Sequence, residues 1–241
     1  MIGLDSDAPL HGDLSRRAVV DTTALEWAPS PSKTVWRKRL HRVGPAESGQ
    51  VTSVVRYDAG ASFPVHDHPE GEEILVLEGV FSDEHGDWPA GTWLLNPEGF
   101  RHAPFSREGC VLFVKLRQAA GAARRHVELS TDQLTWRDTG IVGVQRKELA
   151  AQLEFSDSTW LERWNPGSVL GEREFEGGAE YFVLEGGFSD DAGNYGRGSW
   201  LRLPADSRHR PVTQEGCLLY LKVDALNDLR STKRSLEERS T

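Results

Sequence analysis

One internal repeat constrains the fold of this 241-residue chain more than any other feature. The segment EGVFSDEHGDWPAGTWLLNPEGFRHAPFSREGCVLFVKL recurs as EGGFSDDAGNYGRGSWLRLPADSRHRPVTQEGCLLYLKV. Equivalent residues, such as Gly60 and Gly167 or Cys110 and Cys217, lie a constant 107 positions apart, and no gap is needed from Ser53 to Lys115. Self-similarity of this kind predicts two homologous domains in tandem.

Each copy has the pattern of an antiparallel β-domain. Short apolar runs alternate with turns rich in glycine and proline, and no long stretch has the 3.6-residue period of a helix. The expected strands of the first copy are Val35–Leu40, Val51–Tyr57, Ile74–Leu77, Trp93–Asn96 and Cys110–Leu116. Many short strands at close spacing predict an all-β sandwich or barrel.

The repeat also sets the expected domain limits. Upstream of the gapless region, Val35 matches Val144 at an offset of 109, so one short insertion or deletion separates the copies. We expect an N-terminal arm at 1–20, a first domain at 21–118, a linker at 119–129, a second domain at 130–224 and a charged tail at 225–241, with a short helix in the tail.

The first copy contains a candidate metal site in the stretch GASFPVHDHPEGEEILVLEG. His66 and His68 are two residues apart, so on an extended strand both imidazoles project from the same face. Pro69 and Gly71 supply a turn that can bring the Glu72 carboxylate to the same side. Imidazole and carboxylate donors suit several divalent transition metals, and affinity order alone does not choose among them.

The glycine-framed motifs resemble those of the cupins. The first motif is similar at Gly60, His66, His68, Glu72 and Gly79, and the second at Gly86, Pro89, Gly91, Gly99 and His102. The resemblance covers both halves of the chain, which is identified as a bicupin of the cupin superfamily. More narrowly, it is similar to the ChrR-type cupin group, which includes the cupin domain of ChrR anti-sigma factors and acetylacetone-cleaving type dioxygenases.

The resemblance implies two tandem cupin (RmlC-like jelly-roll) β-barrels. It also implies one divalent transition metal per chain, Fe(II), Zn, Mn or Ni, held in the first domain by His66, His68, Glu72 and His102. The implied activity is that of a non-haem metal-dependent dioxygenase acting on a small dicarbonyl or hydroxy-ketone. The alternative is a ChrR-like cupin that senses a small molecule or stress and regulates without turnover.

The second copy departs from the pattern at the ligand positions. Arg173, Phe175 and Ala179 replace His66, His68 and Glu72, and only His209 remains opposite His102. A single imidazole is a poor metal site, so we expect the degenerate second domain to be metal-free. A sharper hypothesis is an anion-binding face made by Arg173, Arg202, Arg208 and Arg210, since arginine forks suit carboxylate and phosphate.

Other residues are candidates for the surroundings of the site. Glu98 and Arg101 flank His102 and could orient a ligand or a substrate carboxylate, or could equally be turn residues facing solvent. Alternation places Ile74 and Val76 on the inward face with Glu72, and plain core is the favoured role for both. Aromatic walls are expected from Phe63, Trp93 or Phe100.

Composition narrows the partners. The net charge of −9 argues against a nucleic-acid partner, because phosphate contacts need concentrated Lys and Arg. The chain starts without an apolar signal-like region and has no run of about 18 apolar residues, so we expect a cytoplasmic protein without a membrane partner. We expect Cys110 and Cys217 to be buried thiols rather than a disulfide, and the protein to be a homodimer with a small-molecule ligand or substrate.

Overall fold

The computed structural model describes residues 8–45 and 47–226. These residues form two compact units. The first unit comprises 8–12 and 26–131, except for residue 46, and the second comprises 13–25 and 132–226. Apart from two 3₁₀ helices, η1 (Thr22–Ala24) and η2 (Thr131–Gln133), the regular elements of the described residues are strands, which confirms the all-β prediction.

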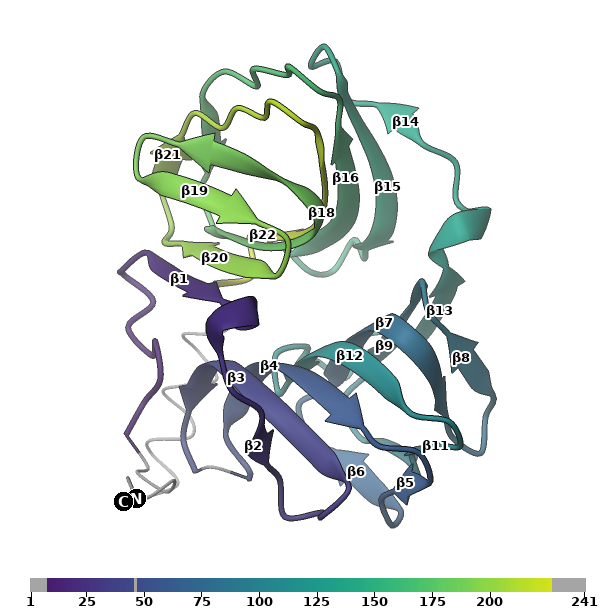
Figure 1. Cartoon of the computed structure of the whole chain (residues 1–241). Coiled ribbons are helices and arrows are strands. Elements are labelled where there is room, and N and C mark those ends of the chain that lie inside the picture. The colour runs from purple at the N-terminus through teal and green to yellow at the C-terminus, as the bar shows by residue number, and fades with distance from the viewer. Residues whose placement is uncertain (1–7, 46, 227–241) are drawn as a thin grey trace. The chain divides into compact units, whose positions relative to one another are not determined.

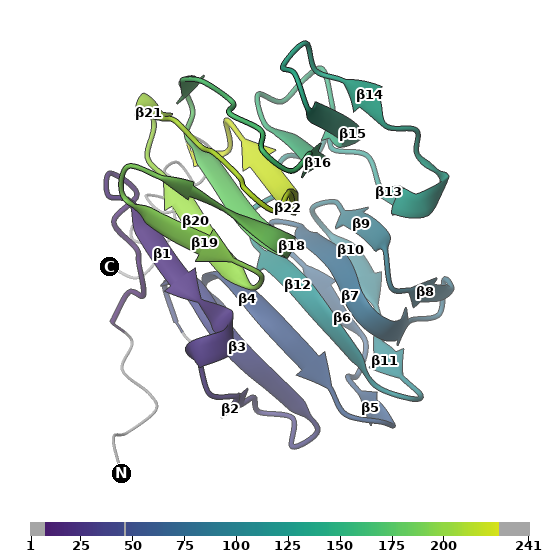
Figure 2. The same ribbon diagram turned by 45° about the horizontal axis from the view of Figure 1, so that its top comes forward.

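The strands of the first unit are β2 (Ala28–Pro29), β3 (Val35–Val43), β4 (Gln50–Tyr57), β5 (Ala61–Ser62), β6 (His66–His68), β7 (Glu72–Ser82), β8 (Asp87–Pro89), β9 (Thr92–Asn96), β10 (Phe100–His102), β11 (Phe105–Ser106), β12 (Cys110–Leu116) and β13 (Val127–Ser130). The main sheet path runs β13-β9-β7-β12-β4-β3-β2, and β6 pairs with β10 in a separate two-stranded sheet. Figure 2 shows β3, β4, β12 and β7 side by side.

The strands of the second unit are β1 (Ala18–Asp21), β14 (Arg137–Asp138), β15 (Val144–Ala151), β16 (Ser158–Trp164), β17 (Arg173–Phe175), β18 (Ala179–Asp190), β19 (Gly193–Gly196), β20 (Ser199–Leu203), β21 (Ser207–His209) and β22 (Cys217–Val223). Their main path, β1-β20-β18-β22-β16-β15-β14, repeats the order of the first unit, and β17 pairs with β21. Two copies of one jelly-roll topology therefore underlie the sequence repeat.

Each repeat gives its first strand to the sheet of the other unit. β1 begins the first repeat but pairs with β20 in the second unit (Figure 1). Its counterpart β13 begins the second repeat but pairs with β9 in the first unit. The backbone N–H groups of Thr22 and Thr131 continue these contacts, donating to the carbonyls of Gly198 and Gly91. The exchange is reciprocal, so each unit is completed by a segment of the other repeat.

The structure therefore differs from the expected domain limits. The predicted arm at 1–20 contains β1, and the predicted linker at 119–129 contains the start of β13. Segments of four residues carry too little hydrophobic periodicity to show where they pair. The predicted tail at 225–241 lies outside the described residues except for its first two, Ala225 and Leu226.

The alternation expected for the central strand is confirmed in the first unit. Ile74 and Val76 on β7 belong to a buried core cluster with Leu94, Leu112 and Phe81. Cys110 and its counterpart Cys217 are buried free thiols, also as expected. Burial raises the pKa of the Cys110 thiol to about 11, so it stays protonated at neutral pH and behaves as a small apolar side chain.

The strand exchange predicts a crossed response to substitution. Thr22→Pro removes the N–H that bonds Gly198, and should speed amide exchange in β20 of the second unit while sparing β9 of the first. Thr131→Pro should have the mirror-image effect on β9. Hydrogen exchange read by mass spectrometry checks both variants. Faster amide exchange confined to strands of the repeat that contains the substituted residue would contradict the exchange of strands.

Candidate metal centre

The antiparallel pairing of β6 with β10 assembles the centre. The register sets His66 directly opposite His102, and alternation along β6 points His68 to the same side as His66. A turn at Gly71 then leads into β7, which begins at Glu72. Gly71 has φ of +72°, and a Cβ there would lie 2.7 Å from the Ala119 carbonyl, so the turn requires glycine.

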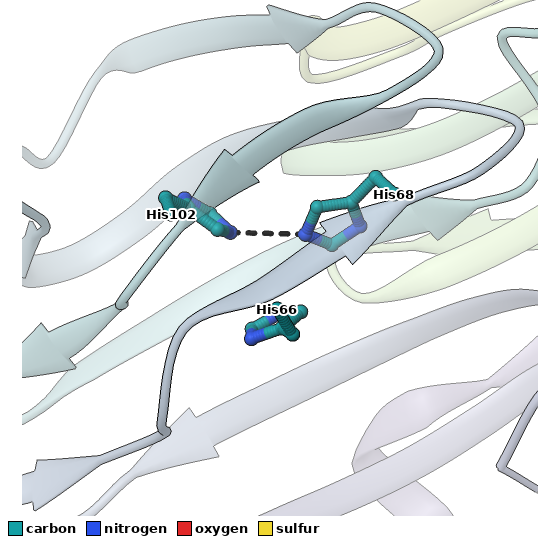
Figure 3. Close-up of side chains that lie close together, drawn as sticks. All are labelled: His66, His68 and His102. Atoms are coloured by element: carbon teal, nitrogen blue, oxygen red, sulfur yellow. Dashed lines mark hydrogen bonds between the residues drawn. The ribbon is translucent and has the colours of Figure 1, made fainter.

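The three imidazoles converge closely enough to hold one ion (Figure 3). Their candidate ligand nitrogens all lie within 4.8 Å of one another, and the Nε2 atoms of His68 and His102 are 3.0 Å apart. Oε2 of Glu72 lies 3.5 Å from the first of these nitrogens and 3.6 Å from the second. Metal–nitrogen bonds of about 2.1 Å place neighbouring donors about 3.0–3.6 Å apart, so the donors of His68, Glu72 and His102 have the spacing that a transition metal requires.

Hydrogen bonds orient the ligand-type side chains. Nδ1 of His102 lies 3.0 Å from Oδ2 of Asp83, and Nδ1 of His66 lies 2.9 Å from the carbonyl of Pro64. Both partners are acceptors, so each Nδ1 carries the proton and each Nε2 keeps its lone pair for a metal. Asn96 donates its side-chain N–H to Oε2 of Glu72 at 3.0 Å, which fixes that carboxylate. Such supporting contacts set the ring orientation at metal sites.

Burial and charge act differently on the two paired histidines. Burial lowers the pKa of His68 and outweighs the opposing charge of Glu72. Burial also acts to lower the pKa of His102, but the hydrogen bond to Asp83 and the charge of Glu72 overcome it, so that pKa is raised. The pKa of Asp83 is lowered, because its hydrogen bonds outweigh desolvation. Asp83 is therefore an anionic partner that stabilises positive charge at the centre.

The structure places Glu98 and Arg101 away from this centre. Both side chains are exposed, and Glu98 accepts a hydrogen bond from the backbone N–H of Gly121 at 2.9 Å. Arg101 is adjacent to His102 on β10, so its side chain projects to the opposite face. The supporting partner of His102 is Asp83, which the sequence reasoning missed. The repeat offered a signal, because Asp83 recurs as Asp190 where His102 recurs as His209.

A cavity of about 330 Å³ in the first unit is lined by His66, His68 and Glu72. Its apolar lining includes Phe63, as expected, together with Val35, Val55, Tyr57, Ile74, Phe81, Leu112 and Val114. The other two expected aromatic residues do not line this cavity, although the Phe100 ring packs edge-on against His102. Trp93 is buried and donates its Nε1–H to Glu73 at 3.0 Å, and Phe100 stacks on His126.

The second unit fills the equivalent position with an ion pair. Arg173 stands opposite His209, as His66 stands opposite His102. The guanidinium of Arg173 donates to both carboxylate oxygens of Glu162, at 2.8 and 3.1 Å. His209 is held between the Tyr181 hydroxyl and Asp190, at 2.9 and 3.1 Å. A buried cation paired in this way does not fit a metal donor set.

The four arginines of the anion-binding hypothesis already have partners in the structure. Arg208 pairs with Glu174 at 2.8 Å and Arg210 with Glu172 at 2.9 Å, both at the surface. The Arg202 guanidinium is buried and donates to the backbone carbonyl of Asp13 at 3.1 Å. With Arg173 held by Glu162, these contacts give the anion-binding face no support.

Comparison with known proteins places the fold in a family. The sequence profile of the ChrR Cupin-like domain matches residues 15–120 and again 124–227. The chain belongs to the ChrR Cupin-like domain family. Its two matches coincide with the two repeats, each including the strand given to the other unit. No curated protein sequence matches closely enough to indicate homology.

Solved structures share the fold of this cupin at low sequence identity. A candidate dioxygenase from Nostoc punctiforme is 17% identical, with 87% of this chain and 83% of that chain covered and a TM-score of 0.72. A bacterial pirin from Escherichia coli in complex with nickel(II) is 13% identical, with 86% and 98% covered and a TM-score of 0.65. Oxalate decarboxylase from Bacillus subtilis is 14% identical, with 89% and 78% covered and a TM-score of 0.58.

The contact between Asp83 and His102 predicts a change in metal affinity. Asp83→Asn removes the charge that fixes the His102 ring, and should weaken metal binding about 10- to 100-fold. Asp190→Asn makes the same change in the second unit and should leave metal affinity unchanged. Competition with a chromogenic chelator measures both. Equal weakening in the two variants, or none in either, would show that Asp83 does not support a ligand.

The surroundings of His209 in the second unit predict a lowered pKa for its imidazole. Burial, opposed by Asp190 and reinforced by the charges of Arg173 and Arg17, lowers the pKa of His209 to about 4. The unfolded state binds a proton at this ring below about pH 6.5, whereas the folded state does so only near pH 4. The free energy of unfolding therefore falls as the pH drops from about 6.5 toward 4. Titration of the ring by NMR tests the value, and a midpoint near 6.5 would contradict it.

Proposed function

We propose that this protein is a metal-dependent oxidoreductase of the dioxygenase type, acting on a small dicarbonyl or hydroxy-ketone. The observation that carries the proposal is the cluster of three imidazoles and the Glu72 carboxylate, of which His66, His68 and Glu72 line a largely apolar cavity in the first unit. As ligands we propose His66, His68, Glu72 and His102. One divalent ion, Fe(II), Zn, Mn or Ni, would polarise a substrate oxygen and, if redox-active, exchange electrons with O2.

The chain's own residues have distinct parts in this proposal. Asp83 and the Pro64 carbonyl hold two imidazoles in the tautomer that exposes Nε2, and Asn96 holds Glu72. Three neutral imidazoles and one carboxylate leave a bound divalent ion with net positive charge, which favours an anionic or enolate-like oxygen donor. Phe63 and Phe81 line the cavity and limit the access of water to a reacting group.

The match to the ChrR Cupin-like domain family supports a second candidate function, that of a small-molecule sensor or regulator without turnover. The same cavity would then bind the ligand, and the metal would hold it in place. The two functions differ in whether the ligand is consumed.

We propose a cytoplasmic homodimer with a small-molecule substrate and without a nucleic-acid or membrane partner. Among the described residues, no helix has both the length and the apolar character needed to cross a membrane. Sedimentation of the purified protein would test the dimer.

The proposed activity predicts oxygen consumption that depends on the ligand residues. Protein mixed with acetylacetone and related small dicarbonyls or hydroxy-ketones should consume oxygen in an electrode cell. His66→Ala should reduce the rate to background with the fold retained by circular dichroism. His85→Ala is the matched control, because His85 is exposed and lies outside the three-histidine group.

Two outcomes would count against turnover. Binding of a dicarbonyl without oxygen uptake would favour the sensor. Oxygen uptake that persists in His66→Ala would separate the activity from the proposed centre.

A further inference from the structure

The cavity of the first unit contains a cationic side chain that the proposed chemistry does not use. Arg37 on β3 lines the same cavity as His66, His68 and Glu72. The Arg37 side chain is 19% exposed, and its guanidinium donates to Glu47 at 2.8 Å, but the Glu47 side chain is 47% exposed. Exposed ion pairs contribute little stability, so a ligand carboxylate could take the place of Glu47.

The second unit contains a counterpart of this arginine, Arg146, that is paired with a buried carboxylate. Arg37 pairs across the strands with Val55 in the first unit, and Arg146 pairs with Glu162 in the second. The two pairs are equivalent in register, and a glutamate replaces a valine. Arg146 donates from Nε and from its terminal nitrogen to Oε1 of Glu162, at 3.1 and 2.7 Å.

The Glu162 carboxylate is fully buried among donors. Besides Arg146, it accepts from Arg173, which stands where the first unit has His66. It also accepts from Nε1 of Trp164 at 3.0 Å, and Trp164 is the counterpart of Tyr57. In the second unit, the Glu162 carboxylate therefore bridges Arg146, the counterpart of Arg37, and Arg173, the counterpart of His66.

The first unit has a valine, Val55, at the position of the Glu162 carboxylate. Val55 and Tyr57 line the cavity, and the side chain of Val55 provides no anion. Arg37 lies at one part of the lining, and His66 and His68 of the three-histidine group lie at another. A divalent ion there would provide the second positive charge that Arg173 provides in the second unit.

We propose that the ligand of the first unit is a small 2-oxo acid whose carboxylate takes the position that Glu162 occupies in the second unit, bound by Arg37 and directed toward the three-histidine group. This inference rests on the proposed function for the metal centre and narrows its substrate to carbonyl compounds that carry a carboxylate. Tyr57 donates its hydroxyl to the same carboxylate, as Trp164 donates its Nε1–H to Glu162.

Calorimetry with two probes of equal heavy-atom count tests the charge preference. Pyruvate carries the carboxylate, and butane-2,3-dione replaces it with a neutral acetyl group. The purified full-length protein should bind pyruvate about 10-fold or more tightly than the dione, the range expected for charge-assisted hydrogen bonds. Arg37→Met should bring the two affinities within about 2-fold. Arg39→Met is the control, because Arg39 also pairs with Glu47 but does not line this cavity.

A second variant installs the carboxylate of the second unit. Val55→Glu should abolish pyruvate binding and keep the metal content, because the new side chain occupies the proposed subsite. It should also be more stable to heat than Val55→Gln, and this difference should disappear in the Arg37→Met background.

The outcomes separate the inference from the function on which it rests. Metal-loaded protein that binds the dione as well as pyruvate, or that keeps its preference in Arg37→Met, overturns the carboxylate subsite and leaves the metal centre standing. Purified protein that contains no metal overturns the proposed function. The preference for pyruvate over the dione then still tests whether Arg37 binds the carboxylate.

Discussion

The register of β6 against β10 is the constraint on which the candidate centre depends. It places His66 opposite His102, and the two-residue period of a strand then adds His68 on the same face. A shift of one residue would turn every one of these side chains away. The second unit keeps the same pairing between β17 and β21, yet presents Arg173 and His209. The scaffold fixes positions, and the residues placed there decide the chemistry.

Much of this arrangement could be predicted from the sequence. The constant offset between copies, the short apolar runs and the glycine-framed motifs predicted two all-β cupin units. The spacing of His66 and His68 predicted a shared face, because alternation along a strand is local geometry. The free thiols and the inward face of β7 were also predictable, since both belong to apolar runs and alternate residues of a strand share a face.

Other features depend on contacts that a pattern along the chain does not contain. The exchange of β1 and β13 is a choice of partner made by tertiary packing, and four residues carry no signal for it. Glu98 and Arg101 are close to His102 in sequence, whereas Asp83 reaches it from the turn that follows β7. The equivalence of Arg37 and Arg146 points to a carboxylate position only through the strand register, which pairs Arg37 with Val55 and Arg146 with Glu162.

We propose that the first unit holds a metal and that an internal ion pair, Arg173 with Glu162, fills the equivalent position in the second. Elemental mass spectrometry of protein purified without added metal tests this claim most directly. The account predicts about one equivalent of a divalent transition metal per chain, lost in His66→Ala and retained in Phe175→Ala. About two equivalents would contradict the assignment of the second unit, and no bound metal would contradict the assignment of the first.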